Sequence, residues 1–483
     1  MRATRLDERL AQAASRTRGQ DAAARRDGTQ VAIRRFLPAL AAVLAASGPA
    51  LAQSAAPSGS PGDAVTVKGS VRVRYEALDG QFRPGLAPRD DIWSVRSTLF
   101  AEWNPGPFRI AGEVYDSRAY GSGPGGVLTT GEVNTFEPVQ LYVAADIDRP
   151  LGERSRLSLQ AGRFTLNLGS RRLVAADDYR NTTNGYTGVR ADLRLADRTN
   201  VTAFYTLPQQ RRPEDPGDLK DNRFKLDRED GSQRIYGGYL SRPLPGGGLA
   251  EAGYVRFREA DRQGRPTRDR DLHSVSARVI TDPKAGRFDY ELEVIRQTGR
   301  IRAGLQANAP VLDVSAGFLH ADAGYTFARP WRPRLSVEYD RASGEDPGGR
   351  YTRFDTLFGM RRADLAPSGI YAALGRTNLE TLGVRLEATP SRRLDVFASG
   401  RALWADSARD SFSTTGVRDP SGASGRFAGY QVEGRARYWI RPETLRAELN
   451  AAVLKKEGLL ARAPNTNPSG DTRYVSLALT ASF

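Results

Sequence analysis

Segments of about ten residues in which polar and apolar side chains alternate recur from Val65 to the C-terminal Phe483. In the first of them, valine and tyrosine side chains alternate with Arg72, Arg74 and Glu76. A period of two places successive side chains on opposite faces of a β-strand. The pattern therefore predicts an all-β fold in which each strand has one apolar and one charged face.

A bundle of membrane-spanning helices is excluded. Mean hydropathy is −0.50, and beyond residue 50 no apolar run approaches the roughly 20 residues that a spanning helix requires. A membrane barrel stays possible, because its strands alternate lipid-facing apolar residues with polar residues that face the lumen. The chain has no Cys, which excludes disulfide scaffolds, Cys-ligated zinc and thiol catalysis.

The alternation predicts eighteen strands, with boundaries loose by a few residues. Their expected ranges are 65–78, 94–103, 108–117, 136–147, 155–168, 184–194, 199–207, 233–241, 249–258, 272–281, 288–298, 314–327, 333–343, 379–389, 393–403, 429–439, 444–454 and 474–483. At Gly162 the apolar residues change from odd to even positions, which predicts a β-bulge there.

The connections between these strands fall into two classes that alternate along the chain. Short turns and long polar loops on opposite sides are typical of outer-membrane barrels, whereas a soluble β-sandwich has no reason to sort its connections in this way. We therefore expect a transmembrane antiparallel up-and-down β-barrel of about eighteen strands over residues 65–483, with short periplasmic turns and long extracellular loops. The short turns include 104–107, 149–154, 242–248, 282–287, 390–392 and 440–443, and the long loops include 79–93, 118–135, 208–232, 259–271, 299–313, 344–378, 405–428 and 455–473.

The last strand closes on an aromatic residue. Val475, Leu477, Leu479, Ala481 and Phe483 share one face of it. A terminal aromatic on an alternating strand resembles the assembly signal of bacterial outer-membrane proteins, and the alternative is a chance Phe on an edge strand. Together with the loop pattern it favours the outer membrane of a Gram-negative bacterium.

The N-terminus has the three parts of a secretory signal. Arg34 and Arg35 precede the apolar stretch 36–46, and Ala50-Leu51-Ala52 supplies a small-x-small cleavage site before Gln53. Eleven apolar residues are too few for a stop-transfer helix. We therefore expect an N-terminal extension and cleaved signal peptide over 1–52, a flexible mature N-terminus over 53–64, and the barrel over 65–483.

The charge balance is basic, with a formal net charge of +15, and only six of the 71 basic residues are Lys. Nucleic-acid binding would favour clustering of these charges on one face, but the arginines are spread along the chain among acidic residues, and no nucleic-acid motif occurs. We therefore expect no nucleic-acid partner.

The sequence also offers little catalytic or metal chemistry. The only histidines are His273 and His320. Ser274, adjacent to His273, points to the opposite face of a strand, and His320 has no Ser two residues away. The acids of the 208–232 segment are interspersed with Arg and Lys and fit no calcium-ligand spacing. We expect no catalytic residue, no metal site and no cofactor.

Several stretches of the first third resemble the alginate-export porin family. They are Arg72-Val-Arg-Tyr-Glu76, Gly112-Glu-Val-Tyr-Asp-Ser-Arg118, Glu137-Pro-Val-Gln-Leu-Tyr142 and Gly162-Arg-Phe-Thr-Leu-Asn-Leu-Gly-Ser-Arg-Arg-Leu173, with weaker similarity at 354–358 and 378–379. The resemblance implies a monomeric eighteen-stranded barrel whose Arg-lined constriction passes an acidic polysaccharide. Exporters of this family can gate with a long periplasmic turn, and every turn on the short side is short here. A loop such as 118–135, folded inward, is then an alternative way to narrow the lumen.

On the predicted register, arginines dominate the inner face. Such a lining raises the local concentration of anions, and each guanidinium can bind a carboxylate bidentately. The alternative is that Arg and Glu on adjacent strands pair with each other and only stabilise the wall. The predicted pore-lining and substrate residues are Arg72, Arg74, Arg96, Glu102, Arg163, Arg190, Arg194, Arg385, Arg435 and Arg437.

These observations predict an outer-membrane channel that conducts anionic oligo- or polysaccharide, alginate-like in its most specific form. Two alternatives stay open: a general or small-anion uptake porin, and a non-conducting surface receptor barrel. The expected partners are the anionic solute, outer-membrane lipid with lipopolysaccharide, and a periplasmic export partner.

Overall fold

The computed structural model describes residues 65–177, 179–360, 364–367 and 369–483, so the predicted signal peptide and the 53–64 segment lie outside the described residues. All eighteen predicted strands are present, and within these described ranges only the two-residue β14 is additional. The strands are β1 Val65–Asp79, β2 Arg89–Trp103, β3 Phe108–Tyr120, β4 Asn134–Asp148, β5 Arg156–Phe164, β6 Tyr186–Arg194, β7 Asn200–Pro208, β8 Gln233–Leu244, β9 Gly248–Glu259, β10 Asp271–Thr281, β11 Arg287–Arg302, β12 Val311–Thr326, β13 Arg334–Ala342, β14 Arg350–Tyr351, β15 Leu379–Ser391, β16 Leu394–Trp404, β17 Phe427–Arg441, β18 Leu445–Lys456 and β19 Thr472–Ser482.

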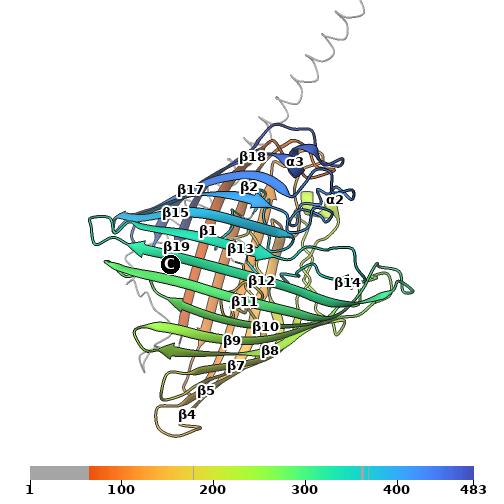
Figure 1. Ribbon diagram of the computed structural model, residues 1–483. Coiled ribbons are helices and arrows are strands. Elements are labelled where there is room, and N and C mark those ends of the chain that lie inside the picture. The colour runs from red at the N-terminus through yellow and green to blue at the C-terminus, as the bar shows by residue number, and fades with distance from the viewer. Residues whose placement is uncertain (1–64, 178, 361–363, 368) are drawn as a thin grey trace, which may run out of the picture.

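The first and last strands close the wall. On β1, Val73 lies opposite Val95 of β2 on one side and Leu479 of β19 on the other. Every other wall strand pairs antiparallel with its neighbours in the chain, and β13 pairs directly with β15, which leaves β14 on a short parallel pairing with β12. Figure 1 shows the tilted strands side by side, with α2, α3 and β14 gathered at the loop end. The predicted antiparallel barrel of eighteen strands is therefore confirmed.

The wall is apolar outside and polar inside. On β13, Leu335 and Val337 are 46% and 50% exposed, whereas Ser336 and Glu338 between them are 1% and 6% exposed. A water-soluble sheet would have the reverse arrangement, so this pattern fits an outer face in contact with lipid. Large exposed aromatic residues lie near both ends of the strands, as in the aromatic girdles of membrane barrels; they include Trp103, Phe108, Phe288 and Trp331 at the short-turn end and Phe136, Tyr205, Tyr254 and Tyr430 nearer the loop end.

The connections sort onto two sides as predicted. Because consecutive wall strands are antiparallel, alternate connections lie at the same end of the barrel. The short turns are 104–107, 149–155, 195–199, 245–247, 282–286, 327–333, 392–393 and 442–444, and the long loops are 80–88, 121–133, 165–185, 209–232, 260–270, 303–310, 343–378, 405–426 and 457–471. The long loops hold two short helices, α2 (Pro216–Lys220) and α3 (Gly458–Arg462). Among the described residues, no helix has the length and apolar character needed to cross a membrane.

Loop 165–185 turns into the barrel. Its Leu166, Leu173 and Val174 are buried with Phe204 and Phe257, which project from the inner faces of β7 and β9. This burial explains the change in apolar phase near Gly162. The strand ends at Phe164 and the following apolar residues enter the interior. The β4–β5 and β5–β6 registers are continuous through Gly162, so the predicted bulge there is wrong.

Loop 343–378 fills another part of the interior. Its Leu365, Ile370 and Tyr371 are buried against the inner wall, where Ile92 and Leu403 belong to the same apolar cluster. The two inward loops meet where the backbone N–H of Ala175 donates to the carbonyl of Phe358 at 3.2 Å. The barrel therefore has an interior built from chain segments as well as from strand side chains.

Loop 121–133, within the segment 118–135 expected to fold inward, packs against loop 165–185, and its Val127 is buried in the same apolar cluster as Ile92 of the inner wall. The side-chain amide of Asn181 donates to the carbonyl of Glu132 at 2.8 Å, and the backbone N–H of Thr182 donates to the carbonyl of Gly131 at 3.2 Å. Loops 165–185 and 343–378 thus occupy much of the interior, and loop 121–133 contacts loop 165–185 through these hydrogen bonds.

Candidate functional site

Three of the predicted arginines hold loop 165–185. Arg72 on β1 and Arg96 on β2 both donate to the carbonyl of Arg180, at 2.6 and 3.3 Å. Arg74 donates to the carbonyl of Tyr179 at 3.0 Å, and its guanidinium lies 4.9 Å from the centre of that ring. Arg74 also lies 3.4 Å from Glu76 on the same strand.

Arg72 and Arg96 belong to a row that crosses six neighbouring strands without an acidic residue. Arg446 of β18 lies opposite Trp439 of β17 on one side and opposite Thr480 of β19 on the other. Thr480 in turn lies opposite Arg72 of β1. Arg72 faces Arg96, and Arg96 faces Ser117 of β3. We call this set, Trp439–Arg446–Thr480–Arg72–Arg96–Ser117, the arginine row. Its three guanidinium groups place positive charge on one arc of the inner wall.

The other predicted arginines of the inner wall are mostly paired with carboxylates. Arg435 and Arg437 pair across adjacent strands, in the ladder arrangement that was the alternative, whereas Arg190 and Arg385 pair with carboxylates two residues away on their own strands. The pairs are Arg190 with Asp192 at 2.6 Å, Arg385 with Glu387 at 2.7 Å, Arg435 with Asp395 at 2.8 Å, and Arg437 with Glu448 at 3.0 Å. Arg385 and Arg435 also lie 4.0 and 4.9 Å from the ring centre of Phe397, which is located between them on β16.

Glu102 and Arg194 occupy the wall toward the short turns. Glu102 lies 3.8 Å from Arg109 and accepts a 3.4 Å hydrogen bond from the hydroxyl of Tyr142. Arg194 ends β6 opposite Asn200, and its side chain is exposed. Neither residue belongs to the arginine row.

Arg163 is placed apart from the inner-wall set. It lies on the same face of β5 as Leu159 and Ala161, which are exposed, and it is near the loop end of that strand. Its guanidinium binds Glu137 at 2.8 Å and Glu229 of loop 209–232 at 2.7 Å. Arg163 is therefore a rim residue that attaches an outer loop.

Arg172, which was not among the residues predicted from the sequence, is a buried arginine with three carboxylate partners. Arg172 of loop 165–185 binds Glu291 at 2.5 Å, Glu293 at 2.6 Å and Asp364 at 2.7 Å. Asp364 of loop 343–378 also binds Arg376. Burial would raise the pKa of Asp364, but the Arg376 and Arg172 guanidinium groups hold it below its usual range. In the sequence, Arg172 lies within the stretch 162–173 that resembles the alginate-export porin family, but no local pattern predicts that its loop turns inward.

Beside this cluster is a cavity of about 410 Å³ that extends to the short-turn end at Pro283. Both signs of charge line it, including Arg172, Arg278, Arg334, Glu338, Arg385 and Glu387. A polar cavity of mixed charge next to the inward loops suits the passage of a hydrated solute better than the binding of an apolar one.

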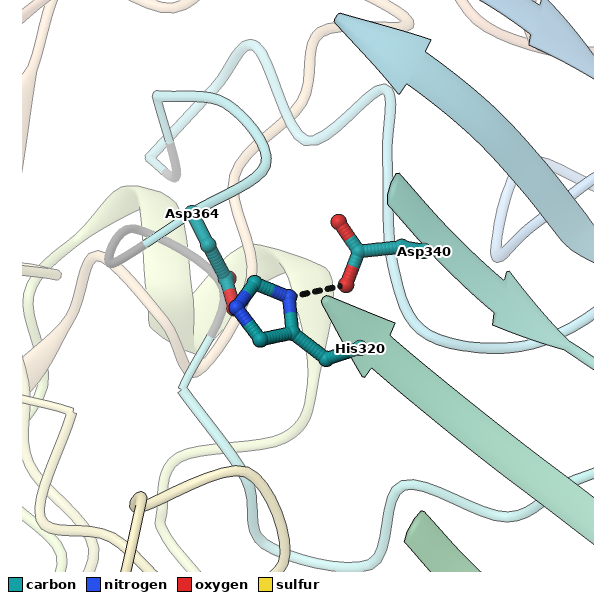
Figure 2. A group of neighbouring side chains, drawn as sticks. All are labelled: His320, Asp340 and Asp364. Atoms are coloured by element: carbon teal, nitrogen blue, oxygen red, sulfur yellow. Dashed lines mark hydrogen bonds and ion pairs between the residues drawn. The ribbon is translucent and has the colours of Figure 1, made fainter. Parts of the chain in front are cut away.

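The two histidines lie in separate places. His273 accepts or donates a 2.8 Å hydrogen bond with the hydroxyl of Tyr254, and His320 bonds through Nδ1 to Asp340 at 2.8 Å. Figure 2 shows His320 between Asp340 and Asp364, whose ligand atoms lie within 4.8 Å of one another. Both oxygens of Asp364 are already engaged by Arg172 and Arg376, and these guanidinium groups would repel a metal cation. We therefore describe His320, Asp340 and Asp364 as part of the charged cluster around Arg172 rather than as a metal site.

A family model described as alginate export matches residues 63–465. The chain belongs to the alginate export family. This family and the closed barrel together make the protein an outer-membrane channel. No curated protein sequence matches this alginate-export-family chain.

Solved structures of similar fold come from Pseudomonas aeruginosa. OccK2 (OpdF), crystallised in complex with glucuronate, is 11% identical, with a TM-score of 0.53, and the match covers 86% of this chain and 98% of that one. OpdK is 11% identical with a TM-score of 0.53, covering 86% and 99%. OccK3 (OpdO) is 12% identical with a TM-score of 0.52, covering 87% and 95%. At these identities the likeness concerns the fold alone.

Proposed function

We propose that this family member conducts anionic oligo- or polysaccharide across the outer membrane of a Gram-negative bacterium, and that alginate-like uronate chains are its most specific cargo. The observation that carries the proposal is the arginine row, which places three guanidinium groups at facing positions of neighbouring strands on one arc of the inner wall. In this proposal the barrel works as a monomer surrounded by lipid and lipopolysaccharide.

The attraction of anions into the lumen depends on the net electrostatic potential rather than on the number of arginines. Where Arg437 lies 3.0 Å from Glu448, the two charges largely cancel for a solute at a distance. In the arginine row, Arg72 and Arg96 donate to a backbone carbonyl, and no acidic residue occupies a facing position of the row. Low-dielectric walls focus such a potential into the lumen and concentrate anions there.

A uronate chain fits this potential because each sugar carries one carboxylate. The positive potential of this arc can attract successive carboxylates weakly, which permits entry and release. The family description, alginate export, names a polymer of this kind. The fold relative OccK2 (OpdF) was crystallised with glucuronate, a single sugar acid. Both facts support a uronate as the cargo. The family description points to a polymer, and the glucuronate complex points to a single sugar acid.

Conductance in a planar bilayer tests the proposal. We expect anion-selective channels that oligouronates block in a concentration-dependent way, while uncharged oligosaccharides of equal length do not. Anion selectivity without any effect of oligouronates would favour the small-anion uptake porin. Correct insertion without conductance would favour the receptor barrel, and either result would contradict the proposed cargo.

A further inference from the structure

A pocket of about 590 Å³ opens at the loop end of the barrel, between loop 209–232 and loop 260–270. Its volume lies within the roughly 300–1,000 Å³ typical of small-molecule sites. The side chains that line it are mostly polar and basic, including Gln210, Arg211, Gln233, Arg262 and Arg265, with one acidic residue, Glu214. It is separate from the arginine row, which lies on the wall of β17, β18, β19 and β1–β3.

Arg211 is the distinctive member of this pocket because its guanidinium contacts only neutral acceptors. Nε donates to the carbonyl of Thr130 at 3.0 Å, and Nη1 donates to Asn184 Oδ1 at 2.5 Å and to the carbonyl of Thr183 at 3.3 Å. Within the described part of the chain, no carboxylate forms an ion pair with Arg211, and no atom accepts a hydrogen bond from its Nη2.

The neighbouring arginines differ in this respect. Arg265 binds Glu214 at 2.8 Å and Arg262 binds Asp230. Arg180, which shares the Asn184 oxygen with Arg211, is paired with Asp177 at 2.8 Å. The charge of Arg211 is therefore the one at this site that no acid neutralises directly.

The electrostatic environment agrees with this geometry. Burial, followed by repulsion from Arg180, lowers the pKa of Arg211 to about 10. The side chain remains charged at neutral pH, and an anion in the pocket would relieve the repulsion. Three contacts to fixed oxygens hold the guanidinium in place before any ligand arrives, so little side-chain entropy is lost on binding.

We infer that this pocket binds a carboxylate of an acidic sugar chain at the loop-end mouth of the channel, with Arg211 as the carboxylate-binding residue. Gln210, Ser232, Gln233 and Thr267 line the same pocket and offer polar groups to sugar hydroxyls. This inference rests on the proposed function and adds a binding site outside the lumen.

Binding of a short oligouronate to the purified full-length barrel, measured by calorimetry at low salt, tests the inference. We expect Arg211→Gln to weaken binding at least about tenfold, as for the loss of one charge-assisted pair. Arg211→Lys should bind with intermediate affinity because it keeps the charge but not the fixed fork. Arg223→Gln is the matched control, since Arg223 lies in the same loop, is exposed and pairs with Asp218 at 3.3 Å. It should bind as the wild type does.

The side of addition separates this site from the lumen. We expect oligouronate added on the loop side to block Arg211→Gln channels less than wild-type channels, with block from the short-turn side unchanged. Wild-type affinity in both Arg211 variants, or equal losses in Arg211→Gln and Arg223→Gln, would overturn the inference while leaving the proposed function intact. Absence of oligouronate binding to the wild type would instead contradict the proposed function itself. If Arg211→Gln does not fold, the comparison of Arg211→Lys with the wild type decides.

Discussion

Arg72 and Arg96 lie opposite each other on β1 and β2, and both donate to the carbonyl oxygen of Arg180. Two like charges on facing positions of adjacent strands repel each other. Here a backbone dipole from loop 165–185 stabilises both. The same side chains thus place positive charge on the inner wall and hold a chain segment inside the barrel.

The arginine row should set ion selectivity, whereas paired arginines should not. We expect Arg446→Gln to reduce the anion-to-cation permeability ratio about twofold or more, because it removes one of the three positive charges of the arginine row. The measurement is the reversal potential in a KCl gradient. The control is the double variant Arg190→Gln/Asp192→Asn, which removes both members of a 2.6 Å pair away from the row and should leave the potential unchanged. Equal shifts in the two proteins would contradict the assignment.

Arg172 should hold the two inward loops together. Removing one partner of a buried ionic group costs about 3–5 kcal/mol, because the carboxylates remain buried without their cation. We therefore expect Arg172→Gln to increase single-channel conductance and open-channel noise, since Glu291, Glu293 and Asp364 lose their common partner. Arg223→Gln removes the same charge from an exposed position of loop 209–232 and should behave as the wild type does. Unchanged conductance in Arg172→Gln would show that other contacts suffice.

Gly162 should be required for assembly of the wall. Its φ is +127°, and an added Cβ would lie 2.4 Å from the carbonyl oxygen of Leu141. We expect Gly162→Ala to cost about 1–3 kcal/mol and to lower the temperature at which the folded band disappears in heat-modifiability gels. At Gly112 on β3 the nearest atom would be 3.7 Å away, so Gly112→Ala should have a much smaller effect. Equal effects would argue against a backbone cause.

Asp227 should make loop 209–232 less stable as pH rises. Burial, with Glu137 nearby, raises the pKa of Asp227 to about 7 in the folded loop, against about 3.9 for an unperturbed Asp. The folded loop therefore binds a proton that the opened loop releases, and its stability falls as pH increases from about 4 to about 7. Asp227→Asn carries no charge, and its oxygen can still accept from Arg212 N and Asn134 Nδ2.

We expect Asp227→Asn to slow hydrogen exchange of peptide 209–232 relative to the wild type at pH 8, with the difference shrinking toward pH 4. Rates are corrected for the intrinsic pH dependence of exchange. Asp221→Asn, an exposed change in the same loop, should show no such trend. A difference that is constant with pH would reject the electrostatic explanation.

The wall of the barrel could be read directly from the sequence. A strand's two faces differ at every second residue, so Leu335 and Val337 could be placed outside, and Ser336 and Glu338 inside, without knowledge of any partner strand. The alternation of short turns with long loops then implied that consecutive strands are antiparallel and that the ends of the barrel differ. For the same reason, the alternation of side chains along each strand was enough to place Arg72, Arg96, Arg385, Arg435 and Arg437 on the inner wall.

Only the tertiary structure decided what occupies the interior. Loop 165–185 turns inward because its apolar residues meet a complementary inner wall, and because Arg172 meets carboxylates of β11 and of Asp364, which is far away in the chain. Which arginines are neutralised depends on such contacts too, so Arg163 became a rim residue and Arg211 was missed. Periodicity is a property of neighbouring residues, whereas the pairing of charges is a property of segments that meet only once the barrel has closed.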